Sequence, residues 1–278
     1  MEQTYTHKIP KIIHYCWFGG NPLPEMALHC IASWKKYCPD YEIIEWNESN
    51  FDLNYNAYVR EAFEAKKWAF ITDVVRLHVL TEYGGIYMDT DVEVLKSLDC
   101  LLNYEAVSGF ESDTMIPTGL MACMKGQPLF LELLHEYDDI HFKNDDGTLD
   151  TTTNVTRITN TCNKYGFEAN NTLQTVCGFT LLPNDYLCPK NPDTLETHIT
   201  ERTLTIHHFD GSWLSEEDKY RKQKRIEYEK RWGHKNAHRL SKLVAAVKFR
   251  GIAGVVAVIT SKVKKGFGKK RNEGERHI

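Results

Sequence analysis

The segment Trp68 to Val92 constrains the fold of this chain more than any other part of the sequence. Its first part, WAFITDVVRLHVLTEY, carries apolar side chains at helical spacing, and Gly84-Gly85 then ends the helix. The apolar run that starts at Ile86 is typical of a buried strand and reaches Val92. A helix that leads directly into a buried strand predicts an α/β fold.

The same alternation of strand and helix patterns continues on both sides of this segment. We predict further strands over residues 9–18, 41–46, 104–110 and 204–209, and further helices over residues 24–37, 55–66, 128–140 and 152–165. This order predicts a three-layer α/β sandwich with a mainly parallel sheet. In such a sheet, ligands bind beyond the carboxyl ends of the strands.

Charged residues are distributed unevenly along the chain. Residues 219–278 hold 19 Lys and Arg against 4 Asp and Glu, whereas residues 1–218 hold 15 against 34. Beyond a charged helix expected over residues 216–232, apolar residues recur at helical spacing among basic ones: Leu240, Leu243, Val244, Val247, Ile252, Val255, Val256 and Ile259. We therefore predict a main domain, residues 1–235, and a basic amphipathic helical tail, residues 236–278.

The tail suits an anionic membrane surface better than nucleic acid, and no nucleic acid partner is expected. A helix packed on the main domain, or a disordered basic end after Lys262, is the alternative. The eight cysteines form no C-x-x-C pair, so they predict neither a zinc site nor a disulfide framework. With no signal peptide pattern and no apolar run of about 20 residues, we expect a cytoplasmic protein, peripheral on the inner face of the cytoplasmic membrane if the tail binds there.

Asp89 and Asp91 are the most informative polar pair in the sequence. On extended backbone, residues two apart project to the same side, so the two carboxylates would converge. Carboxylate oxygens suit Mg²⁺ or Mn²⁺ shared with a diphosphate, whose charge the ion neutralises. A solvated strand end is the alternative, because Asp-x-Asp recurs by chance.

The helix before the strand carries a second candidate pair, Asp73 and Arg76. The two residues lie three apart and therefore share a helix face, where they would be able to hold a sugar. A local ion pair on the helix surface is the alternative. Gly84-Gly85 serves as a helix stop, and the backbone freedom of Gly85 would also allow close approach of a ligand.

Taken together, two stretches resemble a known family. IPKIIHYCWFGG and AFITDVVRLHVLTEYGGIYMDTDV are similar to the DXD-motif sugar transferases of glycosyltransferase family 32. This family includes initiating yeast mannosyltransferases, bacterial capsular polysaccharide transferases and the catalytic domains of large clostridial glucosylating toxins. The resemblance covers roughly residues 8–125 and returns at residues 204–213, where the chain reads IHHFDGSW.

The resemblance implies a GT-A fold, a Rossmann-like sandwich, and a retaining enzyme that uses a nucleotide-sugar with a divalent metal, usually Mn²⁺. By position, Trp17 resembles the aromatic residue that stacks on the nucleotide base. Asp73 and Arg76 resemble the pair that grips the donor sugar, and Asp89 and Asp91 match the DXD motif itself. All four charged residues are therefore candidate catalytic residues, and Gly85 is a candidate donor contact.

In IHHFDGSW, the family resemblance implies a metal or diphosphate ligand and a Trp over the donor. We prefer His208 as the metal ligand and keep His207 as the alternative, because a slip of one residue on a strand reverses which side chain faces the site. Packed or solvent-facing histidines, and a core role for Trp213, are the structural alternatives. Many family members carry N-x-T-G-P, but here the chain reads Asn154-Val155-Thr156-Arg157, which leaves the acceptor side undefined. Glu111 and Asp113 either line the acceptor pocket or cap a strand.

The sequence therefore predicts a retaining glycosyltransferase that moves a hexose or N-acetylhexosamine from a nucleotide-sugar to a saccharide or lipid-linked saccharide in surface polysaccharide or glycolipid synthesis. A UDP-sugar is favoured over GDP-mannose as the donor. One rival function is a sugar-phosphate nucleotidyltransferase, although YCWFGGNPLP lacks the basic residue of a phosphate loop. The other is a non-catalytic, membrane-associated adaptor.

Overall fold

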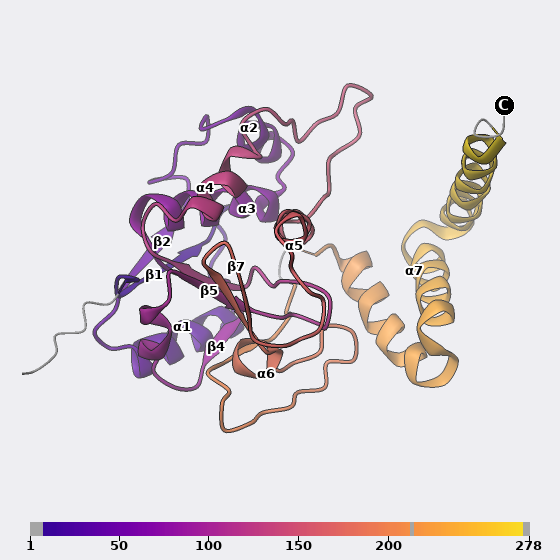
Figure 1. The fold of residues 1–278 in the computed structure, drawn as a ribbon. Coiled ribbons are helices and arrows are strands. Elements are labelled where there is room, and N and C mark those ends of the chain that lie inside the picture. The colour runs from indigo at the N-terminus through magenta and orange to yellow at the C-terminus, as the bar shows by residue number, and fades with distance from the viewer. Residues whose placement is uncertain (1–7, 212–213, 275–278) are drawn as a thin grey trace, which may run out of the picture. The chain divides into compact units, whose positions relative to one another are not determined.

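A computed structural model describes residues 8–211 and 214–274, with side chains for all of them except residue 234 and those beyond residue 254 (Figure 1). The chain divides into two compact units, one ending at Asp210 and one beginning at Gly211. Each unit is described by itself. The functional boundary expected after residue 235 stays a prediction.

The first unit is built on a seven-stranded sheet with the strand order β2-β1-β3-β6-β5-β8-β7. Pairs β1–β2, β1–β3 and β5–β8 are parallel, whereas β6 and β7 run against their neighbours, so five of the seven strands share one direction. The strands are β1 (Ile12–Cys16), β2 (Glu42–Trp46), β3 (Gly85–Met88), β5 (Ala106–Gly109), β6 (Leu120–Cys123), β7 (Gln174–Val176) and β8 (Phe179–Leu182). A separate antiparallel pair joins β4 (Val92–Val94) to β9 (Thr205–His207).

Helices cover both faces of this sheet. Figure 1 shows α2, α3 and α4 on one side and α1 on the other. The helices of this unit are α1 (Glu25–Tyr37), α2 (Ala57–Glu64), α3 (Trp68–Tyr83), α4 (Pro128–His135), α5 (Asn154–Lys164) and α6 (Asn184–Leu187), with a 3₁₀ turn at Asp99–Asn103. Successive residues of β3 enter different cores: Tyr87 packs with the α2–α4 side, and Ile86 and Met88 pack with the α1 side. The expected three-layer α/β sandwich with a mainly parallel sheet, as in a GT-A-like fold, is therefore confirmed.

The strand expected over residues 86–92 is interrupted. β3 ends at Met88, and a turn closed by a 3.0 Å hydrogen bond from Val92 N to the Asp89 carbonyl leads into β4. Because β4 pairs with β9 rather than with the large sheet, the chain changes sheets at this turn. Asp89 and Asp91 therefore lie on a turn and not on extended backbone.

The second unit is dominated by α7 (Glu216–Gly274). Gly233 and Gly251 have non-helical backbone angles and divide it into the segments 216–232, 234–250 and 252–274. The first segment coincides with the charged helix expected from the sequence. Among the described residues, no helix is both long enough and apolar enough to cross a membrane.

His14 is a buried histidine in β1, with no exposed surface. Its Nε2 lies 2.9 Å from the Gly84 carbonyl, and its Nδ1 accepts a 3.1 Å hydrogen bond from the indole of Trp46. Since a carbonyl only accepts and an indole only donates, the ring is neutral with its proton on Nε2. Burial lowers the pKa of His14 to about 4, and the Gly84 carbonyl opposes that shift only in part.

His14 should make the protein less stable in mild acid. The unfolded chain takes up a proton near its ordinary pKa of 6.5, whereas the folded chain does so only near 4. Stability is therefore complete above pH 6.5 and is lost as the pH falls toward 4, at about 1.4 kcal/mol per pH unit from this group. Urea unfolding at pH 7 and pH 5 measures the loss. The variant His14→Gln should reduce the pH dependence, whereas His198→Gln, at an exposed site, should not. Equal slopes for the wild type and His14→Gln would contradict the assignment.

Candidate active site

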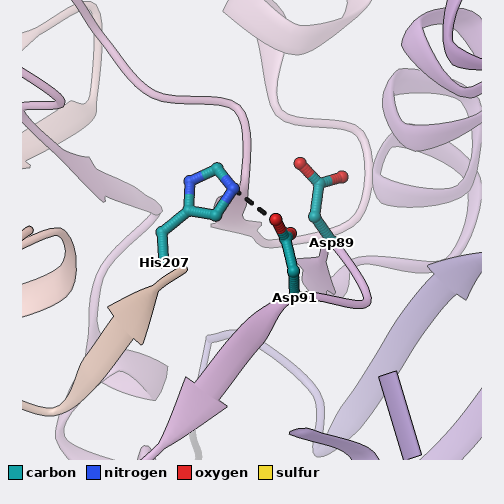
Figure 2. Close-up of side chains that lie close together, drawn as sticks. All are labelled: Asp89, Asp91 and His207. Atoms are coloured by element: carbon teal, nitrogen blue, oxygen red, sulfur yellow. Dashed lines mark ion pairs between the residues drawn. The ribbon is translucent and has the colours of Figure 1, made fainter. Parts of the chain in front are cut away.

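The turn between β3 and β4 brings Asp89 and Asp91 together at the carboxyl end of β3 (Figure 2). The backbone N–H of Asp89 donates to the Gly119 carbonyl at 2.8 Å, which ties the turn to the residue just before β6. The convergence of the two carboxylates expected from the sequence is present, but the turn produces it. This end of the strand is where an α/β sheet binds its ligands.

His207, the last residue of β9, completes a three-residue cluster. Its Nε2 lies 3.2 Å from Asp91 Oδ1, and one ligand atom from each of Asp89, Asp91 and His207 lies within 4.8 Å of the others. Figure 2 shows the imidazole and both carboxylates turned toward one another. A Cβ on Gly119 would lie 2.7 Å from the His207 ring, so a residue without a side chain is needed at position 119.

His208 faces away from this cluster. Its Nε2 lies 2.9 Å from Glu93 Oε2, and His29 lies 3.3 Å from the other oxygen of Glu93. The register of the β4–β9 pair sets Val92 opposite His207, and alternation along the strand then sends His208 to the other side. The structure thus brings the alternative, His207, to the two aspartates, whereas the preferred His208 contacts Glu93.

Asp91 and His207 form a partly buried ion pair. Burial alone would raise the pKa of Asp91, but His207 and the backbone N–H of Asp210, which donates to Oδ2 at 2.9 Å, lower it to about 2. Burial likewise opposes the charge of His207, yet the adjacent Asp91 carboxylate raises the pKa of His207 well above its ordinary value. The cluster therefore stabilises a positive charge beside Asp91.

Arg76 lies behind the cluster and is almost fully buried. Its NH2 is 3.4 Å from both Asp73 Oδ1 and Asp89 Oδ1, and its NH1 donates to the Thr118 carbonyl at 2.8 Å. Burial would lower the pKa of Arg76, but the surrounding negative groups, chiefly Asp89, raise it instead. The predicted pair of Asp73 and Arg76 is thus a buried bridge to the DXD turn and not a surface ion pair.

Asp73 is held by the start of α5. The backbone N–H of Asn154 donates to Asp73 Oδ2 at 3.1 Å, and the Asn154 side chain donates to the Asp73 carbonyl at 2.9 Å. Burial raises the pKa of Asp73 to about 6 against the opposing effect of Arg76. Asn154 therefore contacts Asp73, the residue predicted to grip the donor sugar. The segment that Asn154 begins is the one that lacks the Gly-Pro expected from the family resemblance.

The sequence of this part of the chain matches a known family. Residues 24–108 match a family described as the glycosyltransferase sugar-binding region containing DXD motif. Residues 24–108 are therefore similar to a DXD-containing glycosyltransferase region.

Individual known proteins are also similar to this chain. Inositol phosphoceramide mannosyltransferase 3 of Schizosaccharomyces pombe is 31% identical over 153 residues, which cover 48% of this chain and 41% of that protein. Mannosyl phosphorylinositol ceramide synthase CSH1 of Saccharomyces cerevisiae is 28% identical over 130 residues, which cover 45% and 34%. A solved glycosyltransferase involved in the glycosylation of the major capsid of PBCV-1 aligns at 13% identity with a TM-score of 0.40, covering 71% of this chain and 93% of that chain. The chain spans less than half the length of either yeast relative.

Tyr87 is a residue of the glycosyltransferase region that the sequence analysis missed. Its buried hydroxyl donates to Asp89 Oδ1 at 2.9 Å, and the guanidinium of Arg76 lies 4.7 Å from its ring centre. Among the residues that the structure describes, Oδ1 of Asp89 thus has two partners and Oδ2 has none. The sequence held a signal for this contact, because Tyr87 stands two residues before Asp89, near the end of the strand that leads to it.

The other predicted donor contacts are Trp17, Gly85 and Trp213. Trp17 lies half-buried just after β1, and its indole donates to the Asn21 carbonyl at 2.6 Å. Gly85 begins β3, at the end opposite Asp89, and a Cβ there would lie 2.7 Å from the Ile12 carbonyl. Close packing of β3 on β1 therefore requires a glycine at position 85, and its predicted donor contact stays a prediction. Trp213 lies outside the described residues.

The two acidic residues considered for the acceptor side lie in a tight loop after β5. Ser112 and Met115 form an isolated bridge, and the backbone N–H of Glu111 donates to the Met115 carbonyl at 2.9 Å. Asp113 is exposed at the tip of this loop.

Proposed function

We propose that this chain is a metal-dependent, retaining glycosyltransferase that moves a hexose or N-acetylhexosamine from a nucleotide-sugar to a saccharide acceptor. The observation that carries the proposal is the cluster of Asp89, Asp91 and His207 beside the buried Arg76. Both aspartates and Arg76 belong to the glycosyltransferase region, residues 24–108. The names of the yeast relatives, which concern inositol phosphoceramide, support a glycolipid acceptor. The same names favour a transferase over a nucleotidyltransferase or an adaptor.

The cluster offers a donor set that fits a divalent metal. Two carboxylates supply hard oxygen ligands, and an imidazole beside them favours Mn²⁺ over Mg²⁺. The Oδ2 atom of Asp89, which has no protein partner among the described residues, is available to such an ion. Metal binding would displace the proton from the His207 ring, and the positive charge of the metal would replace that of the imidazolium beside Asp91. A bound metal would neutralise the charge of the departing nucleoside diphosphate.

The surrounding residues would prepare the site for a donor sugar. Arg76 pairs with both Asp73 and Asp89 and holds the Asp89 carboxylate in place. A metal ion bound to Asp89 would therefore meet a carboxylate that is already oriented. Asp73, held by Asn154, would accept hydrogen bonds from sugar hydroxyls, and the half-buried Trp17 would stack on the nucleotide base. No residue is assigned as a nucleophile, because Asp89 and Asp91 would be occupied by the metal.

The donor itself is open to a direct screen. The sequence favours a UDP-sugar, whereas the relatives named as mannosyltransferases make GDP-mannose the second candidate. Release of nucleoside diphosphate from UDP-glucose, UDP-galactose, UDP-N-acetylglucosamine and GDP-mannose, measured with a glycolipid acceptor, identifies the donor. Release from none of these would contradict the proposed donor class.

Metal removal should abolish the activity. Treatment with EDTA is expected to lower the transfer rate by about a hundredfold or more, because a metal supplies several kcal/mol of charge stabilisation. Addition of Mn²⁺ should restore the rate more fully than Mg²⁺. Circular dichroism before and after EDTA serves as the folding control. An undiminished rate in EDTA would refute metal dependence.

The two adjacent histidines provide a matched test of the ligand set. The variant His207→Gln should weaken Mn²⁺ binding by about 10–100-fold, the range seen when the support of a metal site is disturbed, or by more if the ligand itself is lost. The variant His208→Gln removes only the contact with Glu93 and should leave Mn²⁺ affinity unchanged. Metal titrations followed by activity and by Mn²⁺ electron paramagnetic resonance measure both. The reverse order of effects would restore His208 as the ligand.

We also propose that the enzyme works in the cytoplasm on the inner face of the cytoplasmic membrane, where a lipid-linked acceptor would be exposed. The basic composition of the tail supports this location. Deletion of residues 240–278 should reduce the membrane-bound fraction after cell lysis. An unchanged fraction would argue against the tail as an anchor.

A further inference from the structure

The first two segments of α7, residues 216–232 and 234–250, form a helical hairpin (Figure 1). Arg250 near its end pairs with Glu217 near its start at 2.9 Å, and Lys248 Nζ lies 3.9 Å from the ring centre of Tyr220. Between these ends, Ala237, Ser241 and Ala245 are fully buried at four-residue spacing. Small side chains on one face of the second segment thus let the two segments approach closely.

A cleft lies on this hairpin. The first segment lines it with Arg221, Lys222 and Arg225, together with Asp218, and the second segment contributes His238 and Ser241. Its volume of about 190 Å³ is smaller than the roughly 300–1,000 Å³ of pockets that hold drug-sized ligands. The cleft therefore suits a small group such as a single phosphate and not a whole nucleotide.

The charge of the cleft favours an anion. Three side chains that are cationic at neutral pH line it, and Asp218, which pairs with Arg221 at 2.9 Å, is its only carboxylate. Two of the cations are arginines, whose planar guanidinium groups bind phosphate oxygens in pairs. The residues that line the cleft thus carry a net positive charge.

The exposed apolar residues of the hairpin indicate that the phosphate belongs to a membrane lipid. Trp232, Val247 and Phe249 are 41–58% exposed, and Ile252, just after the hairpin, is 85% exposed. Exposed apolar side chains next to basic ones are typical of a surface that rests in the headgroup region of a membrane. Binding to a nucleic acid backbone would require only the basic residues and would not account for the exposed apolar ones.

We propose that the cleft lined by Arg221, Lys222 and Arg225 binds the phosphate group of an anionic phospholipid while the exposed apolar residues enter the membrane surface. This site lies in the second unit and does not depend on the transferase reaction. It differs from general attraction of a basic tail, because it assigns affinity to a defined set of side chains.

The test uses the full-length protein and vesicles of phosphatidylcholine with or without phosphatidic acid. Binding, measured by flotation, should require phosphatidic acid. The double variant Arg221→Gln/Arg225→Gln should weaken it by clearly more than about 25-fold, which is the loss expected when any two surface charges of about fivefold each are removed. The control Lys230→Gln/Lys235→Gln removes the same charge from exposed positions outside the cleft and should weaken binding by about 25-fold or less. Equal losses in the two variants would overturn the proposal in favour of diffuse attraction.

A second arm separates a lipid phosphate from a free one. The variant Ile252→Ser should weaken vesicle binding but leave the response to inorganic phosphate, followed by NMR of labelled arginine side chains, unchanged. Vesicle binding that is insensitive to Ile252→Ser, together with tight binding of inorganic phosphate, would overturn the membrane assignment. Stronger binding to RNA than to phosphatidic acid vesicles would also overturn it. Circular dichroism of every variant confirms that the helices are intact.

Discussion

Replacing either Asp89 or Asp91 with Asn is expected to lower the rate of sugar transfer about a thousandfold at saturating donor, because several kcal/mol of metal-dependent charge stabilisation is removed. Asn keeps the shape of the side chain and one oxygen but loses the negative charge. The Asp89 variant also leaves Arg76 with Asp73 as its remaining carboxylate, and the Asp91 variant leaves the partly buried His207 without its ion-pair partner. Initial rates of nucleoside diphosphate release measure the effect.

A matched control distinguishes this chemical loss from damage to the fold. Asp145→Asn makes the same substitution at an exposed position outside the cluster and should leave the rate unchanged. Thermal unfolding of all three variants reports whether the site variants are folded at the assay temperature. Folded Asp89 and Asp91 variants that keep rates within about fivefold of the wild type would refute the role assigned to the DXD turn, whatever the metal dependence of the protein.

The sequence predicted the part of the fold in which local signals are strong. α3 begins at Trp68 and ends at Tyr83 as expected, because its apolar pattern is continuous and Gly84 adopts a φ of 69° that ends the helix. The strands β6, β7 and β8 were missed. Each has only three or four residues, and β6 is buried along its whole length between β3 and β5, so no alternation of polar and apolar residues marks it.

The change of sheet at Asp89 was not predictable from local pattern. Apolar and polar residues continue from β3 into β4 as they would along one strand, and the decisive event is the pairing of β4 with β9, more than 100 residues later. That pairing also decides which histidine faces the aspartates. A family motif was able to locate IHHFDGSW near the site, but only the register between Val92 and His207 orients its side chains.

The contacts of Asp73 illustrate a second limit of the sequence. Its spacing from Arg76 predicted a shared helix face, but the same spacing occurs in ordinary surface ion pairs. Burial gives the pair its importance, and burial comes from Asn154 on a helix that is distant in sequence. The residue types of the site were therefore predictable, whereas its depth and its supporting contacts were not.

Replacing Arg76 with Gln is expected to destabilise the protein by about 3–5 kcal/mol, because it leaves two carboxylates without their buried counter-charge. The guanidinium is the only cationic side chain that the described structure places within 4 Å of either Asp73 or Asp89. Urea unfolding measures the change, and Arg60→Gln at an exposed helix position should stay within about 0.5 kcal/mol of the wild type. A loss below about 1 kcal/mol for Arg76→Gln would mean that the bridge is not a structural one.

The double variant Asp73→Asn/Arg76→Gln separates stability from activity. Removing the Asp73 charge as well should recover part of the lost stability, because one of the two orphaned carboxylates is gone, but transfer should stay impaired. The single variant Arg76→Gln should also respond to pH. Without the guanidinium, the pKa of Asp73 rises further above its present value of about 6. A folded-state pKa raised above that of the unfolded chain favours folding at low pH and is lost as the pH rises through it. The deficit of Arg76→Gln relative to the wild type should therefore be smaller at pH 5 than at pH 8, and an equal deficit at both would place the cost on Asp89 alone.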